Sequence, residues 1–142
     1  DAVLLAMELE TGLSDAGAHS AQICDAVLPT DFLSRWVRDR KVMSLEAGVR
    51  KLTGELADIM SINRGYLREG MPADLVAFDL ERLDSGPIRR VRDQPGEGER
   101  LIADAPTGIA HVIVNGVPIR SNGAIDQAGL AAGPGQILRC AN

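Results

Sequence analysis

The β-branched run from Ala110 to Val114 is followed directly by Asn115-Gly116, and Val117 to Arg120 then resumes an extended pattern. An Asn-Gly pair between two such runs favours a tight hairpin, because a type I′ turn needs positive φ at both central positions. The pair therefore predicts two antiparallel strands joined by a two-residue turn. It places the C-terminal half of the chain in a sheet.

Further strand signals lie on either side of this hairpin. Asp74 to Asp79 reads as a strand bounded by acids, and Gln136 to Arg139 as a last short strand after a Gly-Pro-Gly turn. Glu81 to Arg100 is rich in proline, glycine and charge, which predicts a long mobile loop. We interpret its basic cluster, Arg89 to Arg92, as part of a solvated loop in preference to an anion site. Three or four strands in all would form a sheet that is marginal on its own.

The stretch from about Pro29 to Met60 has helical spacing. Three helices are expected there, with Thr30, Ser44 and Thr53 as their caps. Apolar residues three and four positions apart give each helix a buried face. These residues are Phe32, Leu33, Trp36 and Val37 in the first helix, Leu45, Val49 and Leu52 in the second, and Leu56, Ala57 and Met60 in the third. The charged residues of the first helix are expected on its outer face: Arg35, Arg38, Asp39 and Arg40.

Charge and composition exclude several classes of function. The net charge of −5 argues against a nucleic-acid or anionic-membrane partner, since both favour clustered Lys and Arg. No apolar run approaches the roughly 18 residues that span a bilayer, and no signal peptide opens the chain. Cys24 and Cys140 match no metal or redox spacing, so we expect two free thiols in a soluble, cytoplasmic protein. Because the chain begins at Asp1 without Met, we expect a piece of a longer polypeptide.

The segment from Ser14 to His19 combines titratable groups with small turn-forming residues, in the order Ser-Asp-Ala-Gly-Ala-His. Small residues let a substrate approach closely, and an acid after a short strand, here Thr11 to Ser14, commonly serves as a metal ligand or general base. Judged by residue type alone, Asp15 is better explained as a turn or helix-cap residue, and His19 as a structural hydrogen-bonding group. His111 falls in a strand run and is expected to be packed or at the surface. Metal-ligand spacing is absent, so the sequence encodes no self-contained metal site.

The Ser-Asp-Ala-Gly-Ala-His segment, preceded by Gly12-Leu13, resembles the last barrel-strand motif of the D-aminoacylase branch of the amidohydrolases. Later segments follow in the order that this branch shows: Trp36 to Arg38, Met43 to Thr53, Gly65 to Asp79, Val112 to Gly116 and Pro134 to Arg139. The resemblance implies an α/β plus β fold, the C-terminal piece of a (β/α)8 barrel followed by part of a small β-sandwich domain. Residues 1–62 would hold the last strand and C-terminal helices of the barrel. Residues 63–142 would form the C-terminal part of the sandwich.

The resemblance also implies a hydrolase acting on carbon–nitrogen bonds other than peptide bonds, by metal-dependent deacylation of N-acyl-D-amino acids. Cyclic amides and other N-acyl compounds are alternative substrates within the same chemistry. Zinc or a similar divalent metal in the full-length enzyme would generate hydroxide from water. Asp15 would be the catalytic residue that orients this water, accepts its proton and returns it to the departing amine. It would contact the metal only together with ligands that this chain lacks. For His19 the resemblance implies a contact with the substrate or with a side chain that holds the metal.

The family's histidine ligands precede the last barrel strand, and the chain contains none of them. We therefore expect the chain alone to bind no zinc and to be inactive, while the full enzyme acts on a small N-acyl amino acid. The alternative is a non-catalytic, stand-alone interaction module. Exposed strand edges and barrel-facing apolar surface predict self-association under either interpretation.

Overall fold

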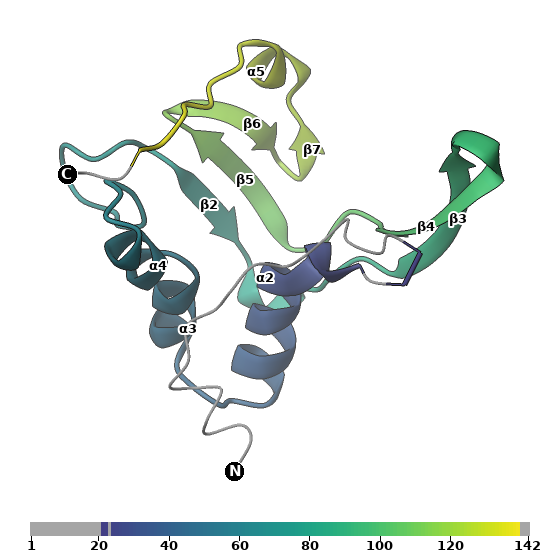
Figure 1. Cartoon of the computed structure of the whole chain (residues 1–142). Coiled ribbons are helices and arrows are strands. Elements are labelled where there is room, and N and C mark those ends of the chain that lie inside the picture. The colour runs from purple at the N-terminus through teal and green to yellow at the C-terminus, as the bar shows by residue number, and fades with distance from the viewer. Residues whose placement is uncertain (1–20, 23, 140–142) are drawn as a thin grey trace.

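The helical and strand-forming stretches form separate layers that meet beside strand β2 (Figure 1). The computed structural model describes residues 21, 22 and 24–139. Its helices come first along the chain: η1 (Asp25–Val27), α2 (Leu28–Asp31), η2 (Phe32–Asp39), α3 (Leu45–Leu52) and α4 (Gly54–Ile59). The strands follow: β2 (Leu75–Phe78), β3 (Ile88–Gln94), β4 (Gly98–Ala103), β5 (Ile109–Val114), β6 (Val117–Ser121) and β7 (Ala124–Ile125). Shorter helical turns complete the fold: η3 (Leu80–Arg82), η4 (Pro95–Glu97) and α5 (Gln127–Ala131).

The segments η1, α2 and η2 follow one another without a break, and η2 is π-helical. Pro29 lies in the first turn of α2, where its missing N–H leaves no helical hydrogen bond unmade. The prediction that Thr30 caps this helix is wrong, because the helix starts earlier and the Thr30 hydroxyl donates to the Val27 carbonyl at 2.9 Å. The predicted inner face is confirmed by the burial of Leu33 and Val37.

Helices α3 and α4 form the second part of the helical layer. The predicted cap of α3 is confirmed: the Ser44 hydroxyl accepts from the Ala47 N–H at 3.2 Å. The predicted cap of α4 is wrong, because the Thr53 hydroxyl donates back to the Val49 carbonyl at 2.7 Å and makes no cap bond. Gly48 lets α3 approach η2 closely, since a Cβ atom there would lie 2.7 Å from the Val37 side chain.

Four antiparallel strands form the main sheet in the order β2-β5-β6-β7. The predicted hairpin is confirmed as β5 and β6, with φ of 47° at Asn115 and 81° at Gly116. The strand predicted between Asp74 and Asp79 is confirmed as β2, which pairs with β5 on one side. Helix α5 packs on β6 at Gly129, where a Cβ atom would lie 1.7 Å from the Pro118 carbonyl oxygen.

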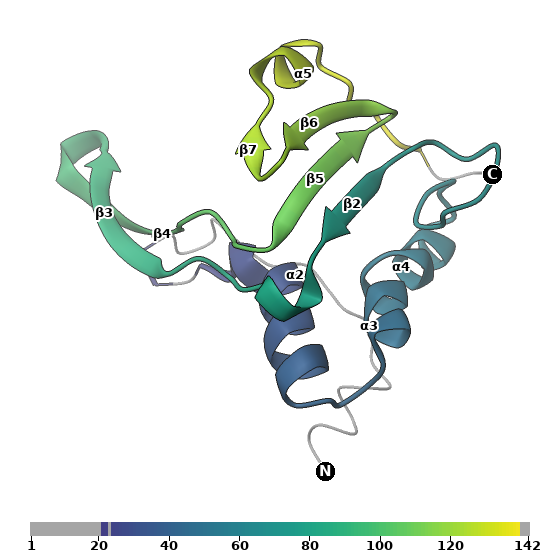
Figure 2. The same cartoon turned by 180° about the vertical axis from the view of Figure 1, so that it is seen from behind.

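Two predictions for the strand region are wrong. The expected loop between Glu81 and Arg100 instead contains η3 and most of the β3–β4 hairpin, a separate two-stranded sheet that projects from the body (Figures 1 and 2). The described part of the chain therefore has six strands, more than the three or four expected. The strand expected at Gln136 to Arg139 is irregular, because no described strand pairs with it.

The buried core joins the two halves of the chain. Leu33 and Val37 of η2 pack with Leu83, which is fully buried and follows η3. The core therefore contains residues from both sides of the division predicted at residue 62, and that division stays a prediction. Cys24 is a buried free thiol, as expected, whereas Cys140 lies outside the described residues. None of the described helices is long and apolar enough to cross a membrane.

Candidate functional site

The two residues predicted to carry chemistry, Asp15 and His19, lie outside the described residues. The strand predicted at Thr11 to Ser14 lies outside them as well. The described chain begins at Ala21, whose carbonyl oxygen accepts a hydrogen bond from Nη1 of Arg90 at 3.0 Å. The structure thus brings strand β3 against the chain two residues after His19 in sequence.

The strands of the β3–β4 hairpin carry ion pairs between arginines and carboxylates. Arg90 and Arg92 both contact Glu99, at 3.2 Å and 2.7 Å. Arg100 pairs with Asp93 at 2.7 Å, and hydrogen bonding to Arg100 lowers the pKa of that carboxyl. Hydrogen bonding to Arg92 likewise lowers the pKa of Glu99. The remaining pair at the base of the hairpin joins Arg89 to Asp104 at 2.8 Å.

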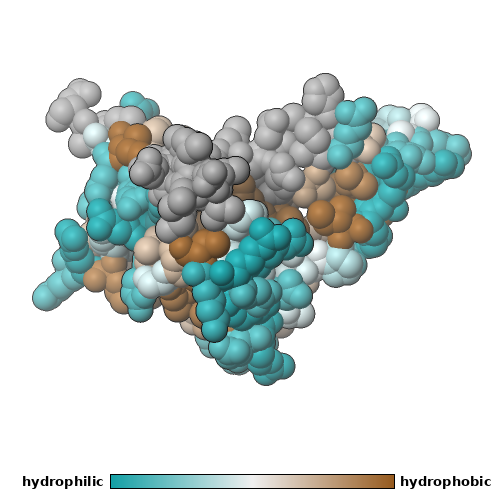
Figure 3. Space-filling view, turned by 90° about the horizontal axis from the view of Figure 1, so that it is seen from below, coloured by the Kyte–Doolittle hydropathy of each residue, from teal (hydrophilic) through white to brown (hydrophobic). Residues whose placement is uncertain are grey.

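Each arginine of β3 and β4 therefore has a carboxylate partner. The three arginines of the basic cluster from Arg89 to Arg92 are paired with Glu99 and Asp104, which argues against an anion site there. The hairpin forms a hydrophilic projection in the view from below (Figure 3). The interpretation of this cluster as solvated thus agrees with the structure, although the loop expected around it is a pair of strands.

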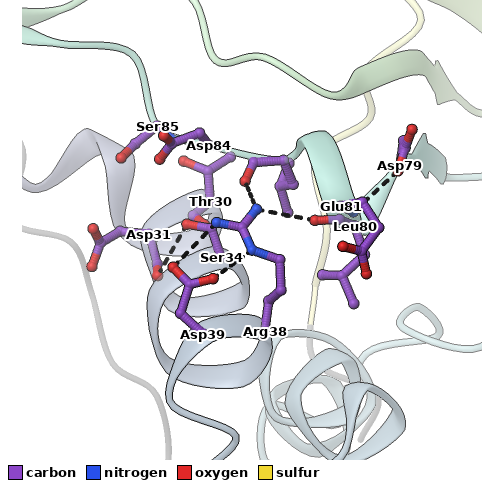
Figure 4. A network of polar contacts seen from close by, with 11 residues as sticks. Thr30, Asp31, Ser34, Arg38, Asp39, Asp79, Leu80, Glu81, Asp84 and Ser85 are labelled. Atoms are coloured by element: carbon purple, nitrogen blue, oxygen red, sulfur yellow. Dashed lines mark hydrogen bonds and ion pairs between the residues drawn. The ribbon is translucent and has the colours of Figure 1, made fainter.

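Arg38 forms a second polar cluster, between η2 and η3 (Figure 4). Its Nη1 atom donates to the carbonyl oxygens of Leu80, at 3.1 Å, and Leu83. Its Nε atom bonds the Asp39 carboxylate at 2.6 Å, which raises the pKa of Arg38 and lowers the pKa of Asp39. The helical period placed Arg38 on the outer face, but its guanidinium turns toward the chain that follows β2. No local signal marked this contact, which joins residues 45 positions apart.

A third polar cluster connects the entry of β2 with the β5–β6 turn. The Asn115 N–H donates to an Asp74 carboxylate oxygen at 2.7 Å, and Arg64 pairs with the other oxygen at 2.6 Å. The Asn115 side-chain amide donates to the Pro134 carbonyl at 2.6 Å. Asp74 and Asn115 belong to the segments Gly65 to Asp79 and Val112 to Gly116, which are among those that carry the resemblance. Their contacts stabilise the turn and the strand entry.

A cavity of about 460 Å³ lies between the helices and β2. Its walls are mainly apolar, with a few polar groups at the margin: Pro29, Thr30, Leu33, Val49, Leu52, Thr53, Gly65, Tyr66, Leu67, Asp74, Leu75, Val76, Phe78, Leu83 and Ile109. The Tyr66 hydroxyl bonds the Asp58 carboxylate at 2.5 Å, which raises the tyrosine pKa. A largely apolar cavity of this kind fits packing or binding of apolar groups better than proton transfer.

The structure places His111 in β5, half-buried and opposite Ala77 of β2. This agrees with the prediction of a packed or surface residue. Within residues 21–22 and 24–139, the His, Cys, Asp and Glu side chains form no group of three or more that could hold a metal ion. The described residues therefore do not fit a metal centre by themselves.

Sequence comparison relates the chain to deacylases. A profile of the amidohydrolase family matches residues 5–120. The N-acyl-D-glutamate deacylase of Alcaligenes xylosoxydans xylosoxydans is 35% identical over 115 residues, which are 78% of this chain and 20% of that enzyme. The N-acyl-D-aspartate deacylase of the same organism is 43% identical over 51 residues, 35% of this chain and 10% of that enzyme. The chain thus spans about one fifth of the first relative's length.

Structure comparison leads to the same branch. A solved structure of D-aminoacylase, described as defining a novel subset of amidohydrolases, matches with a TM-score of 0.56 and 27% identity. The match covers 78% of this chain and 21% of that one. A second D-aminoacylase structure, from work on the role of its binuclear metal centre, matches equally well. With most of its length matched in sequence and in fold, the chain belongs to the D-aminoacylase branch of the amidohydrolase family.

Proposed function

We propose that the chain is part of a metal-dependent amidohydrolase that removes the acyl group from N-acyl-D-amino acids. The observation that carries this proposal is the 35% identity to N-acyl-D-glutamate deacylase over 115 residues. Two curated relatives act on N-acyl derivatives of acidic D-amino acids, as their names state. N-acyl-D-glutamate and N-acyl-D-aspartate are therefore the first substrates to test.

The proposed architecture divides the chain as the resemblance implies. Residues 1–62 would close a (β/α)8 barrel, and residues 63–142 would form part of a small β-sandwich. Two features of the structure support the proposal that further strands complete this sandwich. Strand β2 has a partner only on its β5 side among the described strands, and its Val76 side chain is 56% exposed. The apolar cavity beside β2 offers a surface against which further strands of the sandwich could pack.

The proposed chemistry assigns Asp15 as the catalytic base and acid, and His19 as a substrate contact. A divalent metal, zinc or a similar ion, would supply a bound hydroxide when held by histidines from the rest of the polypeptide. Asp15 would orient the attacking water, accept its proton and deliver that proton to the departing amine. The carboxylate must be ionised for the first of these steps, and a nearby cation would lower its pKa. A cytoplasmic location is part of the proposal.

The test uses the complete reading frame that encodes this chain. The purified product should deacylate N-acyl-D-glutamate or N-acyl-D-aspartate and lose this activity in a chelator. Replacing the catalytic base, Asp15→Asn, should lower kcat by roughly 100-fold or more, the range typical of lost acid–base catalysis. The 142-residue chain alone should show no activity. Metal-dependent turnover by the short chain, or full activity of the Asp15→Asn enzyme, would refute the assignment.

A second candidate function is a stand-alone interaction module, which the exposed Val76 on the edge strand β2 favours. Reading the coding sequence upstream of Asp1 separates the two. A continuous frame with a His-x-His motif supports the hydrolase. A start codon immediately before Asp1 supports the module.

A further inference from the structure

We infer that Asn122, in the turn between β6 and β7, is a site of spontaneous deamidation, whereas Asn115, in the turn between β5 and β6, is protected from it. The inference goes beyond the proposed function and does not depend on it. Each of the two asparagines is followed by a glycine, Gly123 or Gly116. Because a glycine has no side chain, nothing hinders the approach of its backbone nitrogen to the asparagine side chain. Both pairs therefore have the sequence that this reaction needs.

The reaction consumes only water and needs a base to accept a proton. The Gly123 nitrogen gives up its proton to the base and forms a bond to Cγ of Asn122. The bond from Cγ to Nδ2 then breaks, and Nδ2 takes up protons from the solvent and leaves as ammonia. Water opens the resulting succinimide ring at one of its two carbonyl carbons. One opening gives aspartate and the other isoaspartate, so either product replaces a neutral amide by a carboxylate.

The two turns have nearly the same backbone conformation. The φ angles are 47° and 81° at Asn115 and Gly116, and 50° and 79° at Asn122 and Gly123. Each glycine N–H donates to a backbone carbonyl oxygen at 2.9 Å. The dipeptide, the backbone and the state of the attacking nitrogen are thus matched. A difference in reactivity must come from the asparagine side chains and from how firmly each turn is held.

The side chain of Asn115 is held at both of its polar atoms. Its Nδ2 donates to the Pro134 carbonyl at 2.6 Å, and its Oδ1 accepts from Nη2 of Arg64 at 3.3 Å. These bonds must break before Cγ can reach the glycine nitrogen. Asn122, in contrast, is exposed, and no described residue forms a hydrogen bond with its side chain. Its amide is therefore free to rotate toward the nitrogen.

The turn at Asn122 is also held by fewer strand pairs. Strand β7 has two residues, and its pairs with β6 are Arg120 with Ile125 and Ser121 with Ala124. It lies at the edge of the sheet (Figures 1 and 2), whereas β5 has a partner strand on each side. Short edge elements open locally at a low cost in free energy. The turn has to open for the ring to form, because the glycine nitrogen must leave its carbonyl partner.

The experiment incubates the product of the complete reading frame in mildly alkaline buffer and follows both asparagines by peptide mass spectrometry. Asn122 should convert at least about tenfold faster than Asn115, because Asn115 must first lose two side-chain hydrogen bonds, one of them from a charged donor. In urea, where neither turn is formed, the two positions should convert at similar rates. This unfolded sample is the control for the effect of sequence alone.

Two variants test the physical cause. Arg64→Met removes the donor to Oδ1 of Asn115 and should accelerate conversion there by roughly threefold or more. The rate at Asn122 should stay unchanged in this variant, which also shows that the protein remains folded. Asn122→Gln should abolish conversion at that position over the same period, because the longer side chain no longer places its carbonyl carbon for closure of the same ring.

The outcomes decide the inference without any measurement of deacylase activity. Equal rates at the two asparagines of the folded protein, or faster conversion at Asn115, would overturn it. An Asn122 that stays intact in the folded protein while it converts in urea would overturn it as well. An unchanged rate at Asn115 in Arg64→Met would refute the protective role of the side-chain contacts.

Discussion

Asn115 joins three parts of the chain that are distant in sequence. Its backbone N–H donates to Asp74, its side-chain nitrogen to the Pro134 carbonyl, and its side-chain oxygen accepts from Arg64 at 3.3 Å. Its φ of 47° is tolerated because asparagine visits the left-handed region more readily than most residues do. The next residue, Gly116, donates from its N–H to the Ala73 carbonyl at 2.9 Å. The residues of this turn thus have structural roles, although they lie in segments shared with the deacylases.

Gly116 allows a clean test of backbone strain. Its φ is +81°, and a Cβ atom there would have no neighbour within 4 Å, so only the dihedral angle penalises a side chain. Gly116→Ala should lower the free energy of unfolding by about 1–2 kcal/mol. Gly135 is the control, because its surroundings are equally open and it does not have a left-handed φ. Urea denaturation should show Gly135→Ala unchanged or slightly stabilised, and equal losses would contradict this account of the turn.

Arg38 is expected to contribute more to stability than its neighbour Arg35. Arg38→Met removes the donor of the Leu80 and Leu83 carbonyls, whereas Arg35 is 61% exposed and pairs with Asp31 at 3.2 Å. Exposed ion pairs contribute little, and loss of a charged donor to partly buried carbonyls contributes more. Thermal unfolding should therefore show a clearly larger fall in Tm for Arg38→Met than for Arg35→Met. Equal falls would mean that the carbonyl contacts are not important for stability.

At the scale of elements, the β3–β4 hairpin is a two-stranded ribbon, which is marginal in water without further support. Its strands carry ion pairs of arginine with Asp93, Glu99 and Asp104 in place of a large apolar face. Cross-strand pairs of opposite charge stabilise such a ladder by modest amounts each. The hairpin should therefore be the most pH-sensitive of the described strand pairs.

The direction of this pH dependence follows from two carboxyl groups. Arginine partners lower the folded-state pKa of Asp93 and Glu99, so the stabilisation is complete above the unfolded values of about 4. It is lost as the pH falls through the lower folded-state values. Amide protection in β3 and β4, corrected for intrinsic exchange, should fall between pH 6 and pH 3 more than in β5 and β6. A hairpin that keeps its protection at pH 3 would contradict this.

The elements that the sequence predicted well are those stabilised by local contacts. The β5–β6 hairpin depends on Asn115-Gly116, and the cap of α3 on Ser44, so neighbouring residues suffice. The β3–β4 hairpin was missed because its strands pair through charges in a segment with the composition of a loop. The expected strand at Gln136 to Arg139 failed for the opposite reason, since an extended pattern without a partner strand forms no ladder. For the site, the prediction at Ser14 to His19 rests on resemblance alone and lies outside the described residues, and the long-range arginine contacts had no local signal.

At the scale of the whole molecule, large apolar side chains remain exposed on the strands and near them. The face seen from below also shows hydrophobic patches separated by hydrophilic regions (Figure 3). Val76, Ile125 and Ile137 are among the large apolar residues more than half exposed. Unpaired strand edges with apolar side chains are a common route to association. We expect the 142-residue chain to self-associate through the β2 edge.

This association should be weakened by a charge on the edge strand. Val76→Lys introduces a buried charge into any β2-to-β2 contact, so the monomer fraction should rise in sedimentation velocity. Leu130→Lys is the matched control, since Leu130 is 47% exposed on α5, away from that edge. Equal effects of the two substitutions would place the contact elsewhere, and a fully monomeric parent chain would refute self-association.

Because η2 and the residues after η3 share one core, cutting the chain between them should not separate the two halves. Leu83 is fully buried against Leu33 and Val37. The Arg38 guanidinium donates hydrogen bonds to the Leu80 and Leu83 carbonyl oxygens of the same segment. A proteolytic nick near residue 62 would therefore leave two fragments that remain associated and co-purify. Separate expression of the halves would yield pieces that become ordered only when mixed, as in fragment complementation.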